Sequence, residues 1–117
     1  MSERRVTFTR EQIAAYAEAS GDHNAIHLDD EFARSVGLPG VIAHGMLQMG
    51  LLATVAAAAA GGPGHLRRLS VRFGGMVEPG DTVTFHAELA SEGRLELTAV
   101  NQKGEAVLTK ATADFAP

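Results

Sequence analysis

A carboxylate, an amide and imidazoles lie close together in the first quarter of the chain. Residues 20–27 read Ser-Gly-Asp-His-Asn-Ala-Ile-His and contain Asp22, Asn24 and His27. The glycine and the polar composition predict a loop, in which Asp22 and His27 can converge on one water molecule. Such a pair can take a proton from water and deliver a proton to carbon. The alternative, which the residue pattern alone favours, is an Asx-turn followed by an isolated histidine.

The histidines of this segment could instead bind a metal ion. His23 and His27 are four residues apart, which is the spacing of two zinc ligands on one face of a helix. The segment is predicted to be a loop, however, and no third ligand follows at a convincing spacing. The chain contains no cysteine, which excludes thiolate ligands, thiolate catalysis and disulfides. We therefore expect a site without a metal ion or cofactor.

A second segment, residues 41–46, leads into a long apolar run. Gly45 is expected near the N-terminus of a buried helix, where backbone N–H groups have no intrahelical partner. Because glycine lets a ligand approach the backbone closely, a carbonyl oxygen there would be polarised by a free N–H and by the helix dipole. The alternative makes Gly45 a packing glycine and His44 a hydrogen-bonded core residue.

Helices are predicted in the first half of the chain. Thr9 and Gln12 form a capping-box pattern at the start of a helix over residues 9–20, and a short helix fits residues 30–36. A long helix is expected from residue 43 to residue 60. It is apolar nearly all round, which predicts that other structure surrounds it.

The second half of the chain alternates apolar and polar residues with the period of a strand. Four strands with one buried face each are predicted, and a short run near the N-terminus is a candidate fifth. These segments are residues 69–73, 83–89, 95–98 and 107–115, with residues 6–8 as the fifth. The sequence therefore predicts an α+β fold, an antiparallel sheet with one buried helix lying on it, in a single domain over residues 1–117.

Composition narrows the class of protein. With 117 residues, 45% apolar and 21% charged, the chain reads as one folded domain. A net charge of −4 does not indicate the basic surface that binds nucleic acid. The N-terminal residues resemble no signal peptide, and the uninterrupted apolar part of the long helix is too short to cross a bilayer. We therefore expect a cytoplasmic protein with no membrane or nucleic-acid partner.

Both reactive segments resemble the signature of the MaoC-like family, the (R)-specific enoyl hydratases and related dehydratases. That signature is a small residue and Gly-Asp-x-Asn-Pro-aliphatic-His, then an acidic helix, then aliphatic-x-His-Gly-Met at the start of a long helix. The chain matches it at residues 20–27, at Leu-Asp-Asp-Glu-Phe-Ala in 28–33 and at Ile-Ala-His-Gly-Met-Leu in 42–47. The resemblance covers nearly the whole chain, because the predicted strands follow in the expected order.

The resemblance implies a hotdog fold, in which a curved antiparallel sheet wraps around the long helix and two copies pair edge to edge. The implied reaction is the reversible hydration of a trans-2-enoyl-CoA or -ACP thioester to the (R)-3-hydroxyacyl thioester. Asp22 and His27 would form the acid–base pair, Asn24 would orient the water or the loop, and the Gly45 N–H would hold the thioester oxygen. The positions implied to contact substrate are His44 and Met46.

The chain departs from the family pattern at two positions. The proline that usually follows the asparagine is Ala25 here, which loosens the loop without removing a reacting group. Many members carry a serine within the long helix, near the position of Ala53. The loss of that hydroxyl alters substrate positioning and leaves the acid–base pair intact.

Arg68 and Arg72 share the polar face of the strand that follows the long helix. Guanidinium groups bind phosphate in bidentate fashion, so these two could form a cationic rim for the phosphates of CoA or phosphopantetheine. The alternative, a solvated strand face, is slightly favoured by the pattern. The expected partners are therefore an acyl thioester and a second hotdog chain, either a copy or a related subunit.

Two other functions stay open. A non-catalytic hotdog subunit could bind acyl chains or complete a heterodimeric dehydratase, although the intact Asp22 and His27 argue against it. A thioesterase of the same fold would need a carboxylate on the long helix, and residues 43–60 contain neither Asp nor Glu. The sequence does not determine the acyl chain length, the carrier, the direction, the choice between homodimer and heterodimer, or the division of acid and base roles.

Overall fold

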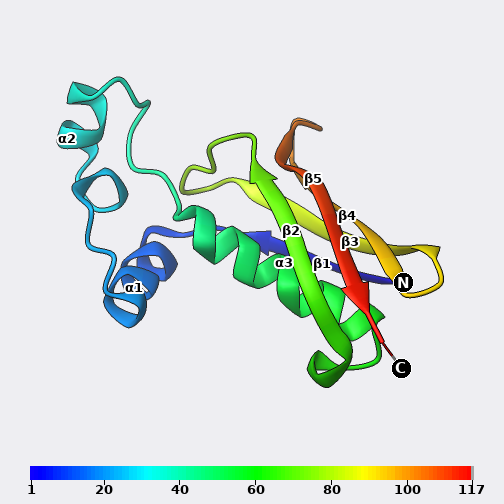
Figure 1. Ribbon diagram of the computed structural model, residues 1–117. Coiled ribbons are helices and arrows are strands. Elements are labelled where there is room, and N and C mark those ends of the chain that lie inside the picture. Colours follow the sequence, from blue (N-terminus) through cyan, green and yellow to red (C-terminus); the bar gives the residue numbers. More distant parts are fainter. Residues whose placement is uncertain (117) are drawn as a thin grey trace.

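The computed structural model describes residues 1–116, which form a five-stranded antiparallel sheet crossed on one face by a long helix (Figure 1). The strand order is β1-β3-β4-β5-β2, so β1 and β2 are the two edges. The strands are β1 (Ser2–Thr7), β2 (Leu66–Phe73), β3 (Thr82–Ser91), β4 (Arg94–Asn101) and β5 (Ala106–Phe115). The predicted α+β class and the antiparallel sheet are confirmed.

Three helices lie between β1 and β2, with a 3-10 turn over Ala25–His27. They are α1 (Arg10–Ser20), α2 (Asp30–Ser35) and α3 (Gly45–Ala59). The Thr9 hydroxyl accepts the Gln12 N–H at 3.1 Å and so caps α1. The return half of the predicted capping box is not formed, because the Gln12 Oε1 has no described partner. No helix among residues 1–116 is long and apolar enough to cross a membrane.

Several predicted boundaries were wrong, including those of the fifth strand and the long helix. The fifth strand is β1, which pairs with β3, whereas Phe8 follows it and is buried in the core. The long helix begins at Gly45, since the residues before it are held extended. The Ala43 N–H donates to the Val77 carbonyl at 2.7 Å, and this bond across to the β2–β3 connection prevents the helix from starting earlier.

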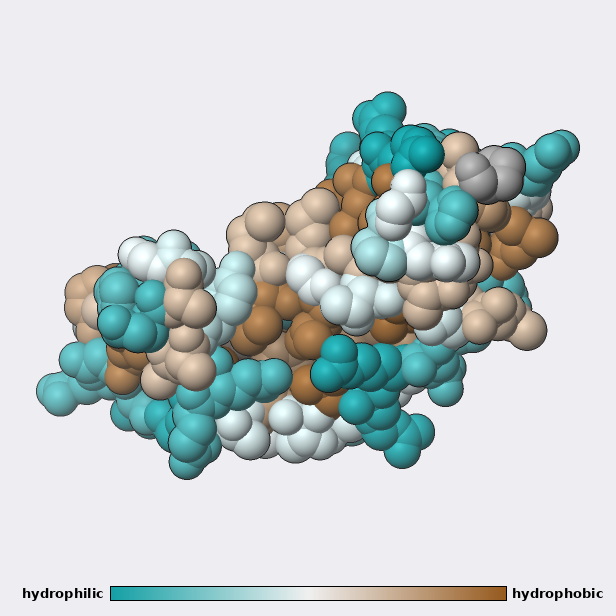
Figure 2. All heavy atoms as spheres, turned by 90° about the horizontal axis from the view of Figure 1, so that it is seen from below, coloured by the Kyte–Doolittle hydropathy of each residue, from teal (hydrophilic) through white to brown (hydrophobic). Residues whose placement is uncertain are grey.

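Helix α3 is covered on one face only within this chain. Leu52, Val55 and Ala56 are buried against the sheet, whereas Met46 and Gly50 are exposed. The prediction that other structure surrounds the helix was therefore wrong for the single chain, because a five-stranded sheet covers one side of it. Figure 2 shows apolar surface across the middle of the molecule, between the lobe of α1 and α2 and the sheet.

A carboxylate fastens this lobe to the segment that leads into α3. Asp30 Oδ1 accepts the Val41 N–H at 2.9 Å, and Asp30 Oδ2 lies 2.9 Å from Arg10 Nη1. The bond from Val41 lowers the pKa of the Asp30 carboxyl, and the Arg10 guanidinium lowers it further. Both contacts favour the ionised form in the folded chain only.

We predict that Asp30→Asn lowers the free energy of unfolding at neutral pH. The folded-state pKa of Asp30 is depressed, so the stabilisation is complete above the unfolded-state pKa of about 3.9 and is lost as the pH falls through the folded-state pKa. Urea titrations at several pH values should show a difference between the variant and the wild type that shrinks below about pH 4. Glu31→Gln, which removes a neighbouring exposed carboxylate, is the control and should have little effect. An equal deficit for Asp30→Asn at every pH would contradict the prediction.

Candidate active site

Asp22 and His27 face each other across the loop that follows α1. Gly21 ends this helix with a φ of 78°, and its N–H donates to the Ala17 carbonyl, so the chain turns there in a conformation that favours glycine. Asp22 Oδ2 lies 3.9 Å from His27 Nε2. This separation is too long for a direct hydrogen bond, and it leaves both atoms able to bond one water. The Asp22 side chain is 54% exposed and that of His27 is 9% exposed, so a ligand reaches the pair from the Asp22 side.

A backbone contact fixes the proton on the His27 ring. His27 Nδ1 lies 2.7 Å from the Ile42 carbonyl oxygen. Because a carbonyl oxygen only accepts, Nδ1 carries the hydrogen, and the Nε2 of the neutral ring is then a free acceptor facing Asp22. The imidazole is therefore oriented to take a proton from a group held between itself and the carboxylate.

Asn24 orders the loop. Its N–H donates to Asp22 Oδ1 at 3.2 Å, and its own Oδ1 accepts the Ile26 N–H at 3.1 Å. Of the two roles proposed for this residue, the contacts match the ordering of the loop. Ala25, at the usual proline position, is the first residue of the 3-10 turn, where proline would pre-organise the backbone without adding a contact.

His44 is enclosed, with a relative exposure of 2%. Its ring stacks on His27 with centroids 3.7 Å apart and meets the edge of Tyr16. Its Nε2 donates to the Asp22 carbonyl at 3.1 Å, which assigns the ring hydrogen to Nε2. Burial lowers the pKa of His44, and the nearby His27 adds to this effect. We expected His44 to contact substrate. Its ring is instead buried, and its contacts with the His27 ring and the Asp22 carbonyl support the loop that contains these two residues.

Gly45 opens α3 as predicted, and the helix start has no side-chain cap. The first intrahelical bond runs from the Gln48 N–H to the His44 carbonyl, so the N–H groups of the preceding turn have no intrahelical partner. A Cβ added at Gly45 would meet ring carbons of Phe73 at 3.0 Å. A larger residue at this position would therefore require the Phe73 ring to shift by a few tenths of an ångström.

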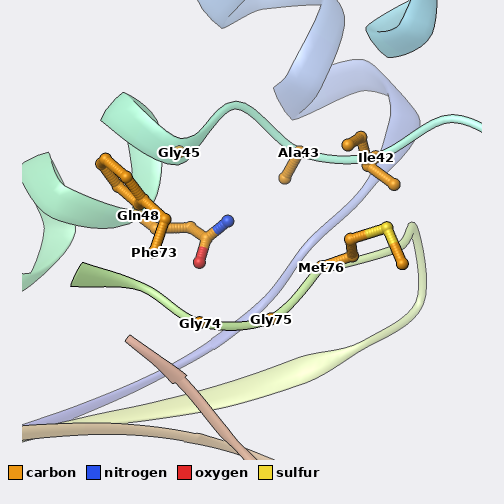
Figure 3. A pocket seen from close by; sticks show the side chains of 8 residues that line it. All are labelled: Ile42, Ala43, Gly45, Gln48, Phe73, Gly74, Gly75 and Met76. Carbon is orange, nitrogen blue, oxygen red and sulfur yellow. The ribbon is translucent and has the colours of Figure 1, made fainter. Parts of the chain in front are cut away.

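Two cavities flank this helix start. One, of about 330 Å³, is lined by Gly45, Gln48 and Phe73 among others (Figure 3). The other, of about 460 Å³, is apolar and is lined by residues including Met46 and Ala53. Met46 is thus placed where it can contact a ligand. Gln48 was not among the predicted site residues, although it is the one carboxamide in the largely apolar helix α3.

Neither Arg68 nor Arg72 lines the two cavities at the helix start. Arg68 is paired in register with Asp114 and shares a small polar cavity with Arg94 and Asp114. Leu69 packs on the core, so by strand alternation Arg68 points to the face opposite α3. Arg72 is exposed beside Thr109. The predicted cationic rim is therefore not assembled at the reactive loop by this chain alone.

The structure also brings together a set of possible metal ligands. One ligand atom each of Asp22, His27 and His44 lie within 4.8 Å of one another. The two imidazoles are stacked, however, with an angle of 22° between their planes, and ring-nitrogen lone pairs lie in the plane of their own ring, so stacked rings are poorly directed at one ion. The His44 Nε2 is also engaged with a carbonyl. His23 lies apart and binds Glu18 at 3.2 Å, and this bond raises the pKa of His23.

Comparisons with known proteins identify the family of the chain. Residues 1–111 match the model of the MaoC like domain. The peroxisomal hydratase-dehydrogenase-epimerase of Neurospora crassa is 34% identical over 113 residues, which are 95% of this chain and 12% of that protein. The peroxisomal enoyl-CoA hydratase 2 of Arabidopsis thaliana is 31% identical over 102 residues, 86% of this chain and 33% of that protein. The chain thus spans a third or less of the length of these relatives.

A solved structure supports the same assignment. The (R)-hydratase from A. caviae involved in PHA biosynthesis is 28% identical, with a TM-score of 0.81 over 96% of this chain and 89% of that one. The sheet order and the helix laid on the sheet confirm the predicted hotdog fold. The family match extends through both reactive segments and four of the five strands into β5. The chain belongs to the MaoC-like family.

Proposed function

We propose that the chain is a hydro-lyase that adds water to a trans-2-enoyl thioester, or removes it from an (R)-3-hydroxyacyl thioester. The observation that carries this proposal is the placement of the Asp22 carboxylate 3.9 Å from the free Nε2 of His27. The hydratase names of the relatives support it. The proposal treats the chain as one catalytic domain, in line with the single sheet of the described residues.

The reaction requires a polarised carbonyl and a positioned water. The β-carbon of an enoyl thioester is electrophilic only when the thioester oxygen is stabilised, and the Gly45 N–H supplies that stabilisation at the uncapped start of α3. Asp22 and His27 hold the water beside the β-carbon. As the water attacks, the pair accepts one of its protons and returns one to the α-carbon, so that a whole water molecule is added.

The contacts around His27 favour a division of the two roles. Since Nδ1 is bonded to the Ile42 carbonyl, the neutral ring can accept a proton at Nε2, and Asp22 orients the water and stabilises the imidazolium that forms. In the dehydration direction the same groups act in reverse order.

The apolar cavity beside α3 suits the acyl chain. It has a volume of about 460 Å³ and is lined by Tyr16, Met46, Met49 and Ala53 among others. Ala53 stands near the position at which many family members carry a serine, so the wall is apolar there. Cytoplasmic localisation stays a prediction, and the two relatives are named as peroxisomal proteins.

We predict that Asp22→Asn and His27→Ala each lower the rate of enoyl-CoA hydration by about 10²–10⁴-fold, because each removes a positioned acid–base group. The measurement is the loss of absorbance of short and medium trans-2-enoyl-CoA substrates, with circular dichroism to confirm folding. His23→Ala is the matched control, since His23 lies in the same loop but is bonded to Glu18. Wild-type rates in either variant would refute the assignment of that residue, whereas absence of hydration by the wild type itself would favour a non-catalytic subunit.

We also predict that the chain assembles as a dimer, with itself or with a related hotdog chain. The open apolar face of α3 and the free edges of β1 and β2 are surfaces that a second subunit would cover. Sedimentation at micromolar concentration should give the mass of two chains for the homodimer. A monomer that hydrates enoyl-CoA with an undiminished rate on dilution would rule the prediction out.

A further inference from the structure

The cavity between the start of α3 and the β2–β3 connection contains a polar group with no partner in the chain. Gln48 points into this space toward Gly74 and Gly75 (Figure 3). The side chain is 3% exposed, and its Oε1 is buried without a hydrogen-bond partner. A buried acceptor left unsatisfied is costly, and buried amides in proteins are ordinarily bonded. The carboxamide is therefore oriented for a donor that comes from outside the chain.

The same cavity reaches the helix N-terminus. Gly45 and Gln48 are three residues apart and so lie on one face of α3. Both residues line this cavity, so a ligand inside it can reach the helix start and the Gln48 carboxamide together. A ligand atom held by the Gly45 N–H would have the Gln48 amide as its neighbour.

The mouth of the cavity is apolar and open. Phe73 and Met76 line the cavity and are both exposed to solvent. The backbone between them offers no donor to Gln48, since the N–H groups of Gly74 and Gly75 both donate to the Val107 carbonyl. An extended ligand entering between Phe73 and Met76 would therefore meet one unsatisfied acceptor on its way to the helix start.

We propose that Gln48 is a specificity-determining residue whose Oε1 accepts a hydrogen bond from the carrier arm of the thioester, at the amide N–H nearest the sulfur. This inference rests on the proposed function, which places the thioester oxygen at the Gly45 N–H. Two methylene groups separate that sulfur from the amide nitrogen in phosphopantetheine thioesters, so the amide lies one short step from the reacting group. The acyl chain binds in the apolar cavity lined by Met46 and Ala53. The carrier arm binds in the cavity that contains the Gln48 carboxamide.

The test compares two trans-2-butenoyl thioesters of nearly the same shape. One is the N-acetylcysteamine thioester, which carries the amide N–H. The other is the 2-acetoxyethyl thioester, in which an ester oxygen replaces that N–H and can only accept. Steady-state hydration of both is measured for the wild type, for Gln48→Met, which keeps the length of the side chain, and for Gln12→Met. Gln12 also has a buried, unpartnered Oε1 but lies in α1, so it is the matched control.

The wild type should hydrate the amide compound with a KM about tenfold lower than that of the ester compound, in keeping with one neutral hydrogen bond. Gln48→Met should abolish this preference by raising KM for the amide compound alone. The kcat should stay nearly unchanged, because the lost contact is made equally in the ground state and the transition state. Gln12→Met should keep the wild-type preference.

An unchanged preference in Gln48→Met would overturn this inference. So would an equal loss of kcat on both compounds, which would place the amide on the thioester oxygen. Both outcomes leave the proposed function standing, since hydration by the wild type is still observed. If the wild type hydrates neither compound nor any enoyl-CoA, the proposed function itself fails, and this inference fails with it.

Discussion

The stacking of His44 on His27 is the interaction on which the rest of the site depends. The His44 ring lies 3.7 Å from the His27 ring and donates to the Asp22 carbonyl, so a single side chain supports both members of the reactive pair. The next residue, Gly45, begins α3. His44 therefore anchors the loop that contains Asp22, and the single peptide bond from His44 to Gly45 links that loop to the start of α3. Burial lowers the pKa of His44, which disfavours a positive charge on the ring that packs against His27.

The start of α3 is costly for folding and useful for chemistry. Ala43 is held extended by its bond to the Val77 carbonyl, and His44 provides no side-chain cap, so the first N–H groups of the helix lack partners. Unsatisfied donors at a helix start destabilise a fold unless a ligand or water bonds them. The same N–H groups form the positive end of the helix dipole. A carbonyl that gains negative charge in the transition state is stabilised there without any rearrangement of the chain.

The features that the sequence predicted well are those set by local chemistry. Thr9 caps the first helix, and Gly21 ends it where the loop with Asp22 was predicted. What the sequence could not show depends on burial by distant segments. His44 packs inward because α1 brings Tyr16 against it, and Arg68 joins Asp114, which lies 46 positions further along the chain, through the pairing of β2 with β5. A residue type and its spacing do not reveal which face of a sheet or loop it will occupy.

The two cavities on either side of the α3 start differ in character, and that difference can orient a substrate. An acyl thioester is apolar on the acyl side of the carbonyl and amide-rich on the carrier side. The cavity that contains Met46 and Ala53 is apolar, whereas the other contains the Gln48 amide. Reversing the substrate would bury amides against hydrocarbon and leave Gln48 unpaired, and burying an unpaired polar group is unfavourable. The polarity of the walls therefore favours an orientation with the acyl chain beside Met46 and Ala53 and the carrier arm beside Gln48.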